Sequence, residues 1–169
     1  MSMRYFQNAG KTYGYDGSDP KQEVLIQSAL SDGWPEVTGN WPPSPTLAQA
    51  QDNQVQILSS ACASAIVAGF SSSALGSAHT YPSQPNDQSN LIGAATVSQT
   101  PGLPSTWTCN FWCADSTGAW ALRPHTAAQT QQVLAAGLAA REALSAKLAG
   151  LVAQVDDATT VASVQAIVW

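Results

Sequence analysis

Charged side chains are scarce in this chain of 169 residues. It has six basic and eleven acidic residues, and between Asn53 and Leu122 the only charged ones are Asp87 and Asp115. Catalysis usually requires several titratable groups that converge on one site. The composition therefore argues against an enzyme, and we expect no catalytic residues. A weakly charged surface with large aromatic side chains is better suited to contact with another protein or a sugar.

Other shortages argue against further classes of protein. Nucleic-acid binding draws on clustered Lys and Arg, and no three of the six basic residues cluster in this sequence. No apolar run approaches the ~20 residues that span a bilayer. The first six residues lack the hydrophobic stretch of a signal peptide, so we expect the protein to begin in a cytoplasm. We expect neither nucleic acid nor membrane among its partners.

Cysteine and histidine are too few and too scattered to predict a metal site. Cys109 and Cys113 share one face of a predicted strand, but they lie about 13 Å apart at ~3.3 Å per residue, which is too far for a disulfide. Together with Cys62, His79 or His125 they do not follow a zinc-binding spacing. We therefore predict no metal, no cofactor and buried, apolar cysteines.

The remaining polar candidates have local explanations. Asp87 and Asp115 stand where a helix cap and a turn require Asp, which we prefer to a glycosidase pair of carboxylates. His125 precedes a predicted helix and is expected to accompany its cap. The run 69–73 lacks the second glycine of a hydrolase nucleophile elbow.

The first module is expected to contain a hairpin and a helix. Aromatic-rich runs at 4–6 and 12–16 flank a Gly-containing loop, which is typical of a β-hairpin. Ser18–Asp19–Pro20 predicts a capped helix start, with Val24, Leu25, Ala29 and Leu30 at helical spacing and Gly33 as its end. Residues 35–38 are expected to form one more strand. The Pro-rich run from Trp41 to Pro45 ends the module.

The second module is expected to be mainly helical. A helix is predicted over 47–68, capped by Thr46, with its apolar stripe on one side and Gln and Asn opposite. Short extended pieces follow around Gly76, then a brief helix over 88–92. The alternation over 106–114 predicts a strand, a turn at 115–118 and a returning strand over 119–123 that Pro124 ends. A long Ala-rich helix to about Val155, with a broken heptad, is expected to pack within the chain, and a last helix over 158–169 follows.

These patterns predict an α+β protein of two modules: a small β-hairpin and helix module over 1–41, and a mainly helical domain with short β-hairpins over 46–169. Trp107 and Trp120 are expected to fill the core across the second hairpin, whereas Trp112 points to the other face. Trp34 and Trp41 lie near turns, where they either seal the small module or sit exposed.

Several short runs in the second module resemble the signature of an uncharacterised domain of phage tail-fibre gene clusters. These runs are 68–76, 79–82, 87–91, 118–120, 125–129 and 164–169. The resemblance covers about 47–169. The runs 3–6 and 13–16, with Gly33 and Trp34, are similar to a short module that often precedes this domain.

The resemblance implies a phage or prophage protein that assists tail fibre assembly. It would act as a chaperone that binds the C-terminal tip of a trimeric tail fibre protein, in the cytoplasm of the bacterial host. The alternative is a structural component of the virion tail, a fibre-tip or receptor-binding subunit, for which a host surface glycan is a further partner. Self-association of the long helix, giving a homo-oligomer, stays open. The candidate partner-binding residues, taken from exposed tryptophans and from the family runs, are Trp34, Trp41, Trp112, Phe70, Tyr81 and Asn90.

Overall fold

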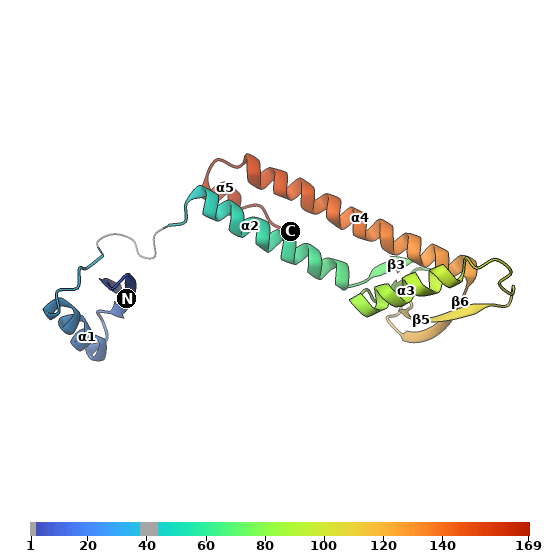
Figure 1. The fold of residues 1–169 in the computed structure, drawn as a ribbon, viewed down its shortest axis with the longest axis horizontal. Coiled ribbons are helices and arrows are strands. Elements are labelled where there is room, and N and C mark those ends of the chain that lie inside the picture. The colour runs from blue at the N-terminus through green and yellow to red at the C-terminus, as the bar shows by residue number, and fades with distance from the viewer. Residues whose placement is uncertain (1–2, 38–43) are drawn as a thin grey trace. The chain divides into compact units, whose positions relative to one another are not determined.

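The computed structural model describes residues 3–37 and 44–169. It confirms the predicted α+β class, with 51% helix and 20% strand. The chain divides into two compact units, Met1–Thr46 and Leu47–Trp169 (Figure 1). Trp41, where the sequence predicted the end of the first module, lies outside the described residues.

The first unit begins with a hairpin. β1 (Met3–Asn8) pairs antiparallel with β2 (Lys11–Asp16). Ala9 and Gly10 form the connection, and both have positive φ. This conformation is typical of two-residue hairpin turns, because its twist matches that of the flanking strands.

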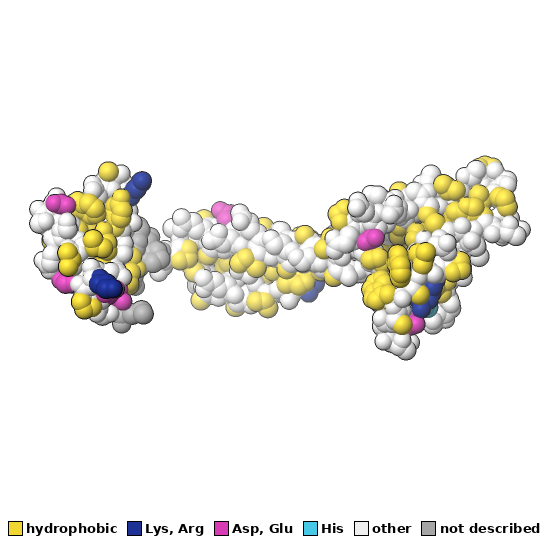
Figure 2. All heavy atoms as spheres, turned by 90° about the horizontal axis from the view of Figure 1, so that it is seen from below, with side chains coloured by type: hydrophobic (Ala, Val, Ile, Leu, Met, Phe, Trp, Pro, Cys, Tyr) yellow, Lys and Arg dark blue, Asp and Glu magenta, His cyan; other side chains and the backbone are white. Residues whose placement is uncertain are grey.

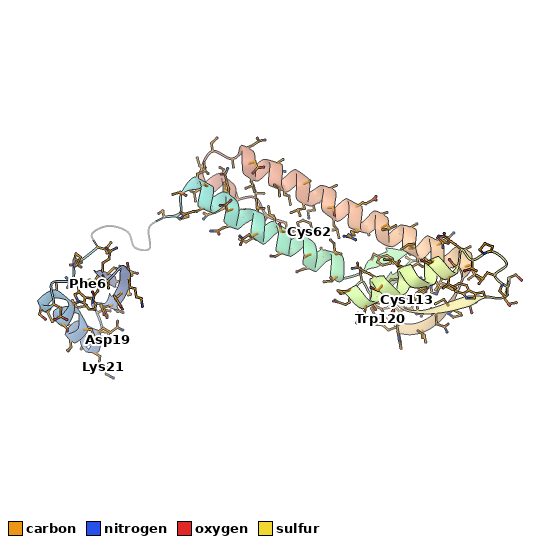
Figure 3. The ribbon with its side chains drawn as sticks, in the orientation of Figure 1. Phe6, Asp19, Lys21, Cys62, Cys113 and Trp120 are labelled. Atoms are coloured by element: carbon orange, nitrogen blue, oxygen red, sulfur yellow. The ribbon has the colours of Figure 1, made fainter. Side chains whose placement is uncertain are left out.

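One helix covers this hairpin. α1 (Pro20–Ser31) begins at the predicted cap, where the Asp19 carboxylate accepts a hydrogen bond from a backbone N–H of the first turn. Phe6, labelled in Figure 3, and Ile26 are fully buried in the core that hairpin and helix share. Of the predicted apolar positions Ala29 is buried, but the prediction was wrong for the other three: Val24 is 69% exposed, Leu25 and Leu30 are also exposed, and Ile26 packs on the hairpin instead. Helical spacing alone admits both faces.

The strand predicted over 35–38 is reduced, in the part that the structure describes, to one bridge between Phe6 and Glu36. An ion pair supports that bridge: the Arg4 guanidinium donates to both Glu36 carboxylate oxygens at 2.7 Å. This hydrogen bonding holds the pKa of Glu36 below its usual value. Thr38 lies outside the described residues.

Two long helices form the body of the second unit. α2 (Leu47–Val67) and α4 (Ala127–Asp157) lie side by side in opposite directions (Figure 1), and the short α5 (Val161–Gln165) packs on α2. Leu58 and Val155 are fully buried among these helices. The predicted packing of the Ala-rich helix within the chain is confirmed.

Not every glutamine of α2 lies on the exposed side, as the sequence had predicted. Gln54 is buried, and its Nε2 donates to the Ile167 carbonyl at 2.6 Å. This bond holds the segment that follows α5. The last helix, predicted over 158–169, is limited to Val161–Gln165. Cys62, labelled in Figure 3, is buried on the same face as Gln54, with its thiol 3.7 Å from the Leu144 carbonyl.

An antiparallel sheet with the order β3-β4-β5-β6 packs against α4, next to the helix α3 (Pro85–Val97). Its strands are β3 (Phe70–Ser72), β4 (His79–Tyr81), β5 (Thr108–Ala114) and β6 (Trp120–Thr126). The buried side chains at this end include Tyr81, Leu91 and Val133.

Two further boundaries differ from the prediction. α3 begins at Pro85, because the Asp87 carboxylate accepts from the Gln84 N–H at 3.0 Å and completes the start of the helix one turn earlier. β6 continues through Pro124, which pairs with Asn110. Proline lacks the N–H of the ladder, but β6 is an edge strand, where one side needs no donor.

Candidate functional site

The β5–β6 hairpin has a register that the sequence did not reveal. Ala114 pairs with Trp120 and Trp112 with Leu122. The predicted four-residue turn, with the return strand starting at Ala119, would have placed Trp120 on the inner face with Cys113. The strands are instead joined by the five residues 115–119, and a shift of one residue moves every side chain of a strand to the other face.

As a result, one face of this hairpin presents large apolar side chains to solvent. Trp112 is 55% exposed, Trp120 is 52% exposed and Leu122 is 53% exposed. The prediction that Trp120 fills the core was therefore wrong, and Trp107 is only half-buried. Figure 2 shows hydrophobic side chains gathered near this end of the second unit, and Figure 3 labels Trp120 on the hairpin. We call Trp112, Trp120 and Leu122 the hairpin face.

The turn that sets this register is held by one carboxylate. Asp115 accepts from the backbone N–H groups of Thr117 and Ala119 and from the Thr117 hydroxyl at 2.6 Å. Its second oxygen accepts from the Arg123 guanidinium at 3.0 Å. These hydrogen bonds, first that of the Thr117 hydroxyl, lower the pKa of Asp115. The predicted turn role of Asp115 is confirmed.

The inner face of the hairpin carries a buried polar contact. The Tyr81 hydroxyl and His125 Nε2 are 2.8 Å apart, and His125 Nδ1 is 2.9 Å from the Arg123 carbonyl. Since a carbonyl only accepts, Nδ1 carries the proton and Nε2 accepts from Tyr81. Burial lowers the pKa of His125 and raises that of Tyr81. The ring edge of His125 also faces Phe111, with centroids 5.2 Å apart.

His125 is thus a fully buried core residue and not a companion of the helix cap, as the sequence had suggested. The cap of α4 is Thr126, whose side chain accepts from the Gln129 N–H while the Gln129 side chain accepts from the Thr126 N–H. This capping box was predicted from the spacing alone.

The His125→Gln variant should remove part of the pH dependence of stability. In the folded chain the pKa of His125 is lowered, so on acidification the unfolded chain binds the proton first. The free energy of unfolding therefore falls as the pH drops from about 7 through the unfolded pKa near 6.5. The glutamine introduced there would still accept from Tyr81 but would not titrate. Urea denaturation at pH 7 and at pH 5 measures the free energy of unfolding of the native chain and of the variant.

The expected result is a smaller loss between the two pH values for the variant than for the native chain. Arg123 and Cys113 are present in both proteins. Equal losses would show that His125 does not titrate differently on folding.

A hollow of about 580 Å³ lies between α3 and β5. Four of the six predicted candidates line it: Phe70, Tyr81, Asn90 and Trp112. Phe70 stacks on Tyr81 with ring centroids 5.6 Å apart, and Tyr81 is only 2% exposed. These two rings therefore form the floor, whereas Asn90 and Trp112 are exposed at the rim.

Sequence reasoning missed several residues of this hollow, notably Gly93, Trp107 and Asn110. Their positions depend on how α3 lies against β5, and no local pattern reports that arrangement. The alternation over 106–114 did separate Trp112 from the inner face of the hairpin.

The other two candidates lie elsewhere. Trp34 is half-buried in the first unit, where it packs against the core and lies 5.2 Å from the Tyr13 ring, centroid to centroid. Trp34 therefore contributes to sealing the small module. Trp41 lies outside the described residues.

Within residues 3–37 and 44–169, no group of three or more His, Cys, Asp or Glu side chains is placed to hold a metal ion. None of the helices in this part of the chain is long and apolar enough to cross a membrane. The hollow and the hairpin face offer aromatic and aliphatic contact, and the hollow adds amide groups and the carboxylate of Asp87.

Residues 49–168 match the model of one protein family. The chain belongs to the family described as Domain of unknown function (DUF4376). The match covers nearly all of the second unit, so the hollow and the hairpin face both lie within the DUF4376 domain. No curated protein and no solved structure matches the chain.

Proposed function

We propose that this protein is a phage tail fibre assembly chaperone that binds the C-terminal tip of a tail fibre protein through its hairpin face. The proposal combines the resemblance to proteins of tail-fibre gene clusters with one observation. Trp112, Trp120 and Leu122 are each more than half exposed on one face of the hairpin. Exposed clusters of large apolar side chains are typical of protein interaction sites, and Trp is enriched among the residues that dominate binding energy.

The scarcity of charge around this face suits the proposed partner. Fibre chains that have not yet trimerised expose apolar surface and unpaired strand edges, which aggregate unless they are covered. Along the hairpin the ion pair of Asp115 and Arg123 is internal to the turn. The hairpin face therefore offers apolar contact without a field of one sign that would restrict it to a charged ligand.

Removal of the two tryptophans should abolish assistance to the fibre. We expect Trp112→Ser with Trp120→Ser to weaken fibre binding at least about 30-fold, because even one residue of this type contributes about 2 kcal/mol or more at the centre of an interface. The assay is co-expression with the fibre protein encoded beside this chain, followed by measurement of soluble, SDS-resistant trimer. The variant should give the same yield as omission of the chain.

Ile57→Ser is the matched control, since Ile57 is 59% exposed on α2, away from the hairpin. It should leave the trimer yield unchanged. Equal yields with and without the native chain would refute the chaperone role. Mass spectrometry of purified particles distinguishes the chaperone from the alternative, because a structural subunit of the virion stays on the particle and a transient chaperone does not.

A further inference from the structure

β5 has an open edge beside the hollow. All seven of its residues pair with β6, but on the other side only Ala114 is paired, with Thr80 of β4. The chain then leaves the sheet at Pro82 and enters α3. Over 108–112, therefore, the described strands leave one edge of β5 without a partner. Backbone N–H and C=O groups on such an edge are ready to pair with another extended chain.

The hollow runs along this edge and has the form of a slot. One wall is β5 from Cys109 to Trp112, and the other is α3, which presents Gly93 and Ala94. A Cβ added at Gly93 would meet no atom within 4 Å, so the space in front of this residue is unoccupied. The five unpaired residues span about 16 Å at the rise of a strand.

We propose that this slot binds an extended peptide segment, which adds to the sheet as a strand beside β5. The segment would continue in the position that β4 would occupy beside β5 if β4 extended beyond Tyr81. In this mode main-chain hydrogen bonds give affinity, and alternate side chains enter pockets. The inward side chains of the segment would lie on Phe70, Trp107 and Phe111, which line the slot and are only half-buried. The identity of the segment rests on the proposed function: it is taken to be the C-terminal strand of the fibre protein.

The charge of the slot lining limits which peptide segments are complementary to it. Among the described residues that line the slot, Asp87 is the only charged one. One of its oxygens accepts from the Gln84 N–H, and the other makes no hydrogen bond within the described residues. A segment with apolar inward residues and a Lys or Arg near Asp87 is complementary to this lining, whereas an acidic segment is not. A glycan would leave the regularly spaced backbone groups of the edge unused, so a peptide is the better occupant.

The experiment uses overlapping synthetic peptides that cover the C-terminal region of the neighbouring fibre protein, and the full chain as receptor. Gly93→Phe should weaken binding of the active peptide at least about ten-fold, because the introduced ring fills the slot. The variant should fold, since Gly is the poorest helix former after Pro. Gly150→Phe on α4 is the matched control: Gly150 is also helical, exposed and open to an added Cβ. It should bind normally.

N-methylation tests whether the peptide binds as a strand. In an antiparallel pair the N–H groups of alternate residues point to the partner. Of two peptides, methylated on the odd or on the even residues, one should therefore lose binding and the other should retain it. Hydrogen exchange should show new protection over 108–112. Loss of binding with both peptides, or with neither, would overturn strand addition.

The outcomes separate the slot from the chaperone role. If no fibre peptide binds, or if the Gly93→Phe variant binds as well as the native chain, the slot is refuted even when trimer yield depends on this protein. If peptides bind in the slot but trimer yield is the same without the chain, the chaperone role is refuted and the slot stands. Oligosaccharides of the host surface that bind the native chain but not the Gly93→Phe variant, where no peptide binds, would overturn the peptide assignment.

Discussion

Gly69→Ala should destabilise the second unit by at least about 3 kcal/mol. Gly69 connects α2 to β3 with a φ of +115°, a conformation that is strained for any residue with a Cβ. A Cβ at this position would lie 2.5 Å from the carbonyl oxygen of Tyr81. The Cβ is fixed directly to the backbone of residue 69, and the carbonyl is part of the backbone of Tyr81. Neither can therefore move aside without disturbing the start of the β3–β4 hairpin. Urea denaturation followed by helical circular dichroism measures the loss.

Gly76→Ala separates strain from steric overlap. Gly76 also has positive φ, +89°, but an added Cβ would meet no atom within 4 Å. Its variant should lose only the cost of the left-handed conformation, about 1–2 kcal/mol. If the two variants lost the same amount, the close approach of Gly69 to Tyr81 would not matter in solution. The result bears on the site, since Tyr81 and Phe70 form the floor of the slot.

Phe6→Ala should unfold the first unit and leave the second folded. Phe6 is fully buried and the core around it contains few other residues, chiefly Ile26 and Ala29. Loss of a buried Phe costs about 3–5 kcal/mol, whereas a unit of this size has on the order of a few kcal/mol in total. Hydrogen exchange, read separately for each unit, should show loss of protection in β1, β2 and α1 only.

Val24→Ala provides the control for this prediction. Val24 lies on the same small unit but is 69% exposed, so its truncation should change stability by less than about 0.5 kcal/mol. If the first unit of the Phe6→Ala variant retained its protection, the core around Phe6 would not be what stabilises that unit. Loss of protection in α2 and α4 as well would show that the second unit depends on the first.

Local chemistry explains which elements were predictable. The start of α1 at Asp19 and Pro20, the capping box of Thr126 and Gln129, and the turn at Asp115 all involve residues within four positions of each other. A cap or turn is decided by such neighbours, so the sequence reports it directly. The same holds for the division into hairpins and helices that makes the chain α+β.

The candidate site was predictable only in part. Phe70, Tyr81, Asn90 and Trp112 were named from sequence and do line one hollow. The reason that they meet is absent from any local pattern, because the slot exists only where β4 stops pairing with β5 and α3 lies alongside. Trp34, also named, belongs to the other unit.

The amino-acid sequence by itself determined the kinds of element, their caps and turns, and the shortage of charge that favours binding over catalysis. Tertiary structure alone decided which face each element buries. One extra residue between β5 and β6 placed Trp120 in solvent, and the contact of Tyr81 with His125 joins residues 44 positions apart. Whether a side chain is buried depends on which other segment packs against it. The period of the side chains therefore specifies the buried face only once the packing partner and the strand register are fixed.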